Sequence, residues 1–251
     1  MERIYLDYNA STPIAPAVAA TISALLSGPF GNPSSDHWAS RPARDILEKA
    51  RAQVARSIGA QPDEIIFTGG CTEANNLALK GSYYALRDRG NHIITQTTEH
   101  PAVLEPLKFL KREGARVTLV SVDRFGQVDP DAIRAAIGPD TILISVMHAN
   151  NETGTVQPIE AIARVAREHG VRFHTDAAQT LGKLPVDVKA LGVDLLSIAG
   201  HKLYAPKGVG ALYVRRGCDV FPLIHGPSQE AGRRSGTENV NRPGFSGGCL
   251  H

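Results

Sequence analysis

A lysine that follows an expected buried strand points most directly to covalent chemistry in this sequence. Lys202 comes after Gly200 and His201, directly behind a mostly apolar run at 194–199. A buried lysine is unfavourable unless it is paired or covalently used, and burial lowers its pKa towards the neutral amine that forms a Schiff base. The alternative is a surface lysine whose stem lies along apolar neighbours while its amine stays in water.

A carboxylate stands at the same position behind another expected strand. Asp176 directly follows the run at 171–175. An acid at the end of a buried strand needs a partner, and a carboxylate held against a ring nitrogen keeps that nitrogen protonated. Pyridoxal 5'-phosphate (PLP) requires this protonation to withdraw electrons from its substrate. The alternative is that Asp176 caps the segment that follows.

Three further polar loops follow expected strands. In 68–76, two glycines precede a helix whose free N–H groups suit a phosphate, and Thr72 adds a hydroxyl; a Thr-capped helix after a tight turn explains the loop equally well. It is not a Walker A loop, because no Gly-Lys-Ser/Thr follows. His100 suits ring stacking or proton transfer, or is a loop histidine near a helix start. Asn151 suits donation to a ring substituent, or is a turn residue.

Together these loops supply a phosphate cradle, a stacking histidine, a ring-nitrogen carboxylate and an imine-forming lysine. No nicotinamide or ATP site uses all four. The elements that must position them alternate between strands and helices, which predicts an α/β fold: a mostly parallel sheet of about seven strands with helices on both faces. In such a sheet, ligands bind at the carboxyl ends of the strands. The expected strands are 64–68, 92–96, 116–120, 141–147, 171–175, 194–199 and 208–214, and the expected helices are 41–58 capped by Ser40, 72–89, 101–113, 129–137 and 158–169, with a short helical stretch between 175 and 194.

Composition narrows the function classes. The 251 residues carry 27 Lys+Arg against 25 Asp+Glu, a balance that leaves no electrostatic footprint for nucleic acid or an anionic membrane. The apolar runs are too short to span a bilayer, and the first residues contain no secretory signal, so we expect a cytoplasmic protein. Three cysteines without a CxxC spacing, Cys71, Cys218 and Cys249, argue against a disulfide framework or a zinc site.

The sequence resembles the cysteine desulfurases, NifS/IscS-like members of the class V aminotransferase group of fold-type I PLP enzymes. The resemblance covers roughly residues 3–240, and its motifs occur in a fixed order along the chain. We therefore expect a PLP-binding large domain at 1–240, an atypical tail at 241–251, and no counterpart of the family's C-terminal small domain. The supporting motifs are 6–12 (LDYNAST), 31–35 (GNPSS), 67–76 (FTGGCTEANN), 99–100 (EH), 150–154 (NNETG), 176–179 (DAAQ), 200–202 (GHK) and 229–239 (QEAGRRSGTEN).

The resemblance implies a role for each site residue. Lys202 forms the imine with PLP, Asp176 pairs with the ring nitrogen and Gln179 contacts the ring hydroxyl. His100 stacks on the ring and moves protons, and Asn151 lies beside the ring. The remaining implied contacts are with the phosphate (Cys71, Thr72 and His201), with the phosphate of a partner subunit in a homodimer (Thr237), and with the substrate (Asn9, Ala10, Asn32 and Asn151). Ala199 stands where the family often has a hydroxyl residue, which removes one side-chain contact to the phosphate.

The reaction implied by the family converts L-cysteine to L-alanine and leaves the sulfur as a persulfide on a nucleophilic cysteine, from which it passes to iron–sulfur cluster assembly or thiolation. The nucleophilic cysteine and the arginine that binds the substrate carboxylate have no matching position here, and Cys249 in the tail would replace the nucleophile only by accident. Two alternatives stay open: a PLP-binding protein or dimer partner without turnover, and a different PLP lyase or transaminase.

Overall fold

A seven-stranded sheet forms the centre of the molecule. The computed structural model describes residues 3–240. The sheet has the order β1-β7-β6-β5-β4-β2-β3, and β7 runs opposite to the other six strands. The strands are β1 (Ile65–Thr68), β2 (His92–Gln96), β3 (Arg116–Val120), β4 (Thr141–Ser145), β5 (Arg172–Asp176), β6 (Leu195–Ala199) and β7 (Gly210–Val214). The predicted mostly parallel sheet is confirmed, and each expected strand is present within about two residues of its predicted ends.

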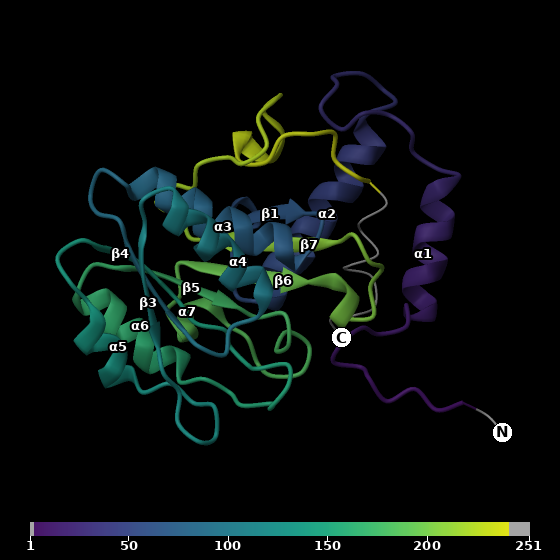
Figure 1. The fold of residues 1–251 in the computed structure, drawn as a ribbon. Coiled ribbons are helices and arrows are strands. Elements are labelled where there is room, and N and C mark those ends of the chain that lie inside the picture. The colour runs from purple at the N-terminus through teal and green to yellow at the C-terminus, as the bar shows by residue number, and fades with distance from the viewer. Residues whose placement is uncertain (1–2, 241–251) are drawn as a thin grey trace.

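Helices cover both faces of this sheet, as predicted (Figure 1). One face packs in a single apolar cluster against α2, α5, α6 and α7, and the other packs against α3 and α4. Most strands are buried on both faces, which explains why their sequences do not alternate regularly between apolar and polar residues. These helices are α2 (Arg41–Ser57), α3 (Cys71–Leu86), α4 (Pro101–Arg112), α5 (Pro130–Ala136), α6 (Ile159–Glu168) and α7 (Val188–Leu191).

The structure differs from the sequence analysis in three local features: a cap, a helix end and an additional helix. Ser40 does not cap α2 through its side chain: its hydroxyl donates to the carbonyls of Ser35 and His37 instead. Helix α3 ends at Leu86 rather than near residue 89. A further helix, α1 (Pro16–Leu26), occupies a segment that we left unassigned. Three short 3-10 helices complete the described elements: η1 (Pro62–Glu64), η2 (Gly200–Lys202) and η3 (Gln229–Gly232).

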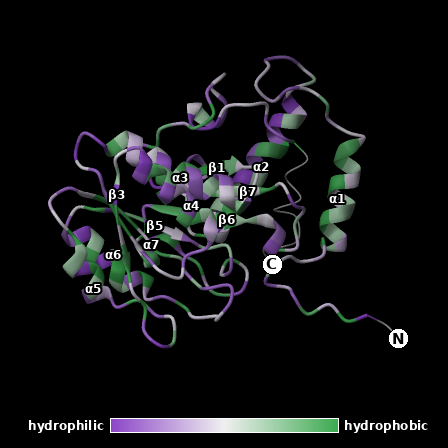
Figure 2. Cartoon of the chain, in the orientation of Figure 1, coloured by the Kyte–Doolittle hydropathy of each residue, from purple (hydrophilic) through white to green (hydrophobic). Residues whose placement is uncertain are grey.

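Helix α1 lies apart from the two helical layers, and Val18 is its buried residue (Figure 1). Its turns are nevertheless mostly hydrophobic (Figure 2). The flanking segments also carry large exposed apolar side chains, including Leu6 at 84% and Phe30 at 83% of full exposure. The N-terminal part of the chain therefore exposes more apolar surface than the sheet layers do. Within residues 3–240, no helix is both long enough and apolar enough to cross a membrane.

A buried ion pair joins the last described segment to the sheet. Nη1 and Nη2 of Arg51 in α2 donate to the carboxylate of Glu230 in η3, at 2.7 and 3.0 Å. The same carboxylate accepts the backbone N–H of Phe67 in β1, and Arg51 also donates to the carbonyl of Ile65. Both oxygens of the Glu230 carboxylate and all three nitrogens of the Arg51 guanidinium, whose Nε donates to Glu48 at 3.3 Å, thus make hydrogen bonds, as a buried charge requires.

Candidate active site

A cavity of about 1020 Å³ opens at the carboxyl ends of the parallel strands. Loops after β1, β2, β4, β5 and β6 contribute to its wall, as expected for ligand sites in open α/β sheets. The N-terminal segment 7–11 closes one side. Of the predicted site residues, the cavity is lined by Asn9, Ala10, Cys71, Thr72, His100, Asn151, Asp176, Gln179, His201 and Lys202.

Lys202 enters the cavity from η2, the single turn that follows β6. Its ammonium donates to the backbone carbonyl of Asn9 at 2.7 Å. Burial lowers the pKa of Lys202, and the nearby negative charge of Asp176 opposes that shift. The side chain is half-buried rather than lying in bulk water, which favours the reactive reading of this lysine over the surface one.

Asp176 is 5% exposed at the end of β5, and three donors hold its carboxylate. Its Oδ2 accepts the side-chain N–H of Asn75 at 2.6 Å, and its Oδ1 accepts the backbone N–H of Ala178 at 2.9 Å. The thiol of Cys71 lies 3.4 Å from the same Oδ1. Asp176 therefore caps the next segment, as the alternative predicts, and also presents its carboxylate to the cavity, while its contact with a ring nitrogen stays a prediction.

The glycine loop after β1 brings backbone close to the cavity. Gly70 has φ +152°, a conformation that L side chains rarely adopt, and a Cβ on Gly210 of β7 would lie 2.5 Å from the carbonyl carbon of Gly70. The close approach therefore needs glycine at 210, and the backbone conformation needs it at 70. Helix α3 begins directly afterwards, so the N–H groups of its first turn face the cavity and suit a phosphate.

Glu73, in the same first turn, places a negative charge where a phosphate would bind. Its carboxylate is already occupied, because it accepts the Gly69 N–H at 2.6 Å and pairs with Arg234 at 2.8 Å. The ion pair neutralises the charge, so the cradle remains compatible with an anion. Arg234 was quoted in a motif without a role; the structure explains it as the counter-ion of Glu73.

His100 both caps a helix and faces the cavity. It is the N-cap of α4, and its Nδ1 accepts the N–H of Ala102 at 3.0 Å. The proton of the neutral ring therefore sits on Nε2. The modest reading of a histidine near a helix start is correct, and it fixes the tautomer and the orientation of a ring that also lines the cavity.

Gln179 is oriented by a second lysine that the sequence analysis missed. Its Oε1 accepts from Lys183 at 3.0 Å, which turns its Nε2 towards the Asn9 carbonyl, also at 3.0 Å. Lys183 stands four residues after Gln179 in a run of turns at 178–183, and that short spacing was the available signal. Burial and the charge of Lys202 lower the pKa of Lys183.

Three predicted residues complete the wall or its surroundings. His201 lies 3.4 Å from the hydroxyl of Ser11, and burial lowers its pKa. Asn151 donates to Glu152 at 2.6 Å. Burial, followed by the charge of Asp176, raises the pKa of the Cys71 thiol well above its usual value, so this thiol stays protonated and is a poor nucleophile.

Asn32 and Thr237 do not line the cavity. The two loops that carry them nevertheless meet each other, because the hydroxyl of Ser34 donates to the carboxylate of Glu238 at 3.3 Å. Within one chain, Asn32 and Thr237 are therefore separated from the other predicted site residues. Cys249 and the 241–251 tail lie outside the described residues.

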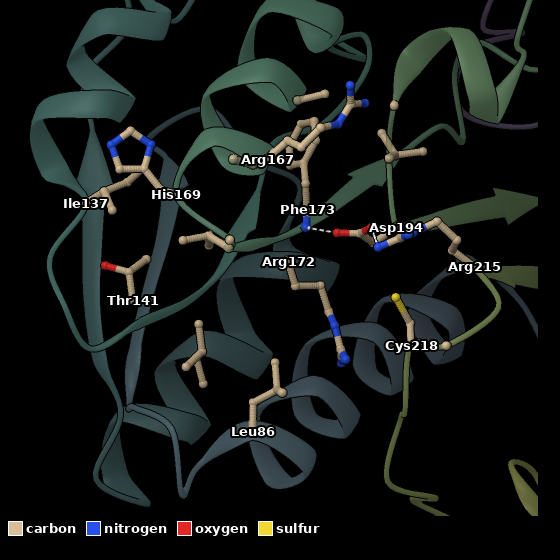
Figure 3. Close-up of a pocket in the computed structure, with 18 of the residues that line it drawn as sticks. Leu86, Ile137, Thr141, Arg167, His169, Arg172, Phe173, Asp194, Arg215 and Cys218 are labelled. Carbon is tan, nitrogen blue, oxygen red and sulfur yellow. Dashed lines mark hydrogen bonds and ion pairs between the residues drawn. The ribbon is translucent and has the colours of Figure 1, made fainter.

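A second cavity, of about 830 Å³, lies at the opposite edge of the sheet, where the parallel strands β4, β5 and β6 begin. Figure 3 shows residues that line it. This cavity contains none of the predicted site residues, and its positive charges have structural partners. Arg215 pairs with Asp194 at 2.7 Å, and Arg172 donates to the Asp219 carbonyl. The other cations lie in or just after the last turns of helices, where they stabilise the helix dipole: Arg89, Arg167 and Lys189.

Comparison with known proteins identifies the family to which the chain is related. The family model described as aminotransferase class-V matches residues 4–228. The cysteine desulfurase IscS of Dictyoglomus turgidum is 55% identical over 94% of this chain, and the putative cysteine desulfurase IscS 1 of Bacillus subtilis is 49% identical over 98% of it. The alignments cover 60% and 65% of those two relatives.

Two solved structures superpose closely on the chain. A NifS-like protein matches with a TM-score of 0.96 at 40% identity, covering 99% of this chain and 69% of that one. SspA in complex with cysteine matches with a TM-score of 0.95 at 43% identity, covering 99% and 72%. The chain thus belongs to the class-V aminotransferase family, and it is similar to cysteine desulfurases over the part of those proteins that it spans.

Proposed function

We propose that this chain is the cofactor-binding part of a PLP-dependent cysteine desulfurase. Its reaction would convert L-cysteine and a protein thiol into L-alanine and a protein persulfide. The observation that carries the proposal is the convergence of Lys202, Asp176 and the first turn of α3 on one cavity. Class-V aminotransferases and cysteine desulfurases use PLP, and the donor set of this cavity fits that molecule.

Each part of the cofactor has a matching group in the cavity. The N–H groups at the start of α3, with Thr72 and His201, would bind the phosphate, and Asp176 would hold a proton on the ring nitrogen. Gln179 already points an N–H into this region, where it would donate to the ring hydroxyl. Once bound, PLP supplies an electron-withdrawing ring that acidifies the substrate's α-carbon.

The proton transfers fall to two side chains. Burial lowers the pKa of Lys202, which favours the neutral amine that can take a proton. His100 carries its proton on Nε2, because its Nδ1 is used as the helix cap, and it is therefore set to donate from that atom. Asn9, Ala10 and Asn151 line the cavity where the substrate would lie.

The accepting thiol is proposed to lie outside residues 3–240. Within the described part, the free cysteines are Cys71 and Cys218. The Cys71 thiol is protonated beside Asp176, and Cys218 lines the cavity at the opposite edge of the sheet. This observation also favours a second candidate function, a PLP-binding protein or dimer partner without turnover. A sulfur-acceptor or scaffold protein as a further partner stays a prediction.

The test loads the purified chain with PLP and adds L-cysteine in the presence of a reducing thiol. Yellow protein with release of alanine and sulfide in equal amounts supports the desulfurase. Yellow protein without alanine supports the binding protein, and colourless protein contradicts both. Release that persists in Cys249→Ser excludes Cys249 as the nucleophile.

A homodimer is part of the proposal, because Asn32 and Thr237 lie away from the cavity of their own chain while their loops contact each other through Ser34 and Glu238. In a symmetric dimer, such a loop pair can reach the partner's cavity. Sedimentation of the PLP-loaded chain is expected to give a dimer, and Thr237→Ala is expected to weaken PLP binding. A monomer with full PLP affinity would contradict the proposed homodimer.

The cytoplasmic location also stays a prediction, tested by cell fractionation.

Replacing Asp176 with asparagine is expected to weaken PLP binding by roughly 10–150-fold, because hydrogen bonds to charged groups contribute about 1.5–3 kcal/mol. Asparagine keeps the shape but removes the charge opposite the ring nitrogen. Absorbance titration with PLP measures the effect. The control is Asp140→Asn, which removes an exposed pair with Arg116 and should leave PLP affinity unchanged. Equal affinities in the wild type and Asp176→Asn would remove Asp176 from the site.

A further inference from the structure

Buried polar atoms without a hydrogen-bond partner gather beside the active-site cavity. Residues 96–99, at the end of β2, hold three of the five such side-chain atoms in the described part of the chain. These three atoms are Gln96 Oε1, Thr98 Oγ1 and Glu99 Oε2. A buried acceptor without a donor destabilises the fold, so each one needs an explanation.

The carboxyl group of Glu99 is 5% exposed and only half satisfied. Its Oε1 accepts the backbone N–H of Met147 at 2.6 Å and the side-chain N–H of Gln96 at 3.1 Å. Its Oε2 has no donor, and neither has Oε1 of the same Gln96. The acid and the amide thus share one hydrogen bond already, and each keeps one unused acceptor.

A proton on Glu99 Oε2 would turn one of these two acceptors into a donor for the other. The carboxylic acid and the carboxamide would then be joined by two hydrogen bonds, and both unsatisfied atoms would be explained at once. We propose that Glu99 is a neutral carboxylic acid in the folded protein, paired in this way with Gln96, and that it is a positioning residue for the loops carrying His100 and Asn151.

The position of Glu99 explains how it acts on these two loops. The β2–β4 pairing ends at Thr95 and Ser145. Beyond that point the bond from Met147 to Glu99 continues the connection, and Asn150 adds a second bond to the Thr98 carbonyl at 2.9 Å. Glu99 directly precedes His100, and Met147 lines the cavity.

The surrounding charges agree with a neutral acid. Burial, together with the charge of Asp176 in β5, raises the pKa of Glu99 to about 8, although the Met147 and Gln96 donors oppose the shift. Cys71 of α3, His100 of α4 and His148 after β4 also surround the cavity end of the sheet, but among these groups only Asp176 acts on the pKa of Glu99. A neutral Glu99 places no second negative charge next to Asp176.

Infrared spectroscopy of the chain without added PLP tests the protonation directly. The carbonyl stretch of a carboxylic acid is expected at pH 7, to disappear as the pH passes about 8, and to be absent in Glu99→Gln. The control is Glu64→Gln. Glu64 is also buried, but both of its oxygens accept backbone N–H groups, so this variant should keep the band. A wild-type band that is absent at pH 7, or that survives in Glu99→Gln, overturns the proposal.

Thermal unfolding supplies a second readout with a defined sign. The folded state holds the Glu99 proton up to about pH 8 and the unfolded state only up to about 4.5, so the wild type loses stability as the pH rises through this window. Glu99→Gln does not titrate, so its Tm should gain on the wild type by roughly 3–5 °C per pH unit there. A Tm difference that stays constant with pH contradicts the proposal.

The positioning role rests on the proposed PLP site and is tested separately. Glu99→Gln should keep the wild-type PLP affinity and absorbance spectrum, and Glu99→Ala should weaken PLP binding and alter the spectrum. Equal affinity and spectrum in Glu99→Ala and the wild type overturn the positioning role. Because the infrared band is measured without PLP, a failure of the proposed function would leave that band in place.

Discussion

Lys202→Ala is expected to abolish the fixation of PLP by borohydride, with no cofactor mass retained on the denatured chain. Any amino-acid turnover should fall by at least about 100-fold, since a positioned proton-transfer group typically contributes 10²–10⁴-fold. The physical reason is that Lys202 combines a cavity position with a pKa lowered by burial. Mass spectrometry of reduced, digested protein locates the modified residue.

Two other lysines serve as controls for this prediction. Lys183 belongs to the same hydrogen-bond network through Gln179 and Asn9, and Lys207 lines the same cavity. Lys183→Ala and Lys207→Ala should each keep the borohydride-fixed cofactor on Lys202. Cofactor mass that persists in Lys202→Ala and maps to either control lysine would reassign the anchor.

Breaking the buried pair of Arg51 and Glu230 is expected to produce the largest loss of stability. Arg51→Met leaves the Glu230 carboxylate 8% exposed and without its counter-ion, which costs about 3–5 kcal/mol of unfolding free energy for a buried pair. Although burial acts against it, Glu230 raises the pKa of Arg51, so the guanidinium stays charged in the native pair. Denaturant unfolding measures the loss.

The matched control replaces an arginine whose pair is exposed. Arg216 bonds Asp63 at 2.7 Å with both side chains more than half exposed, and Arg216→Met should change the unfolding free energy by only about 0–1 kcal/mol. The double variant Arg51→Met with Glu230→Leu should be less destabilised than Arg51→Met alone, because no buried charge then remains unpaired. A double variant that is less stable than Arg51→Met would contradict the desolvation argument.

The sheet and the cavity were predictable because their signals are local. Runs such as 141–147 are mostly apolar, and the loops with polar residues begin where each strand ends, so the carboxyl-edge rule assembles Lys202, Asp176 and His100 without further information. The same local reading failed for Ser40, whose hydroxyl finds carbonyl partners in the preceding turn and is no longer available as a cap.

Other features depend on partners that are distant in the chain. Glu99 reads as a motif residue, and its burial beside Met147 and Asp176 follows only from the order of the strands. Asn32 and Thr237 lie away from the cavity that their motifs suggested, because their proposed role involves a second copy of the chain. Helix α1 is too evenly apolar for an amphipathic pattern, so it gave no periodic signal.

The ion pair between α2 and η3 also sets an order on events at the ribosome. Arg51 is synthesised 179 residues before Glu230. At about 5–20 residues per second, that interval lasts about 10–40 s. During it, the guanidinium lacks its buried partner and has only the exposed carboxylate of Glu48 beside it. Strand β1 also waits for its neighbour β7. The surfaces of α2 and β1 that η3 and β7 later cover therefore have to remain accessible to water, or to a chaperone, until nearly all of the described residues have been translated.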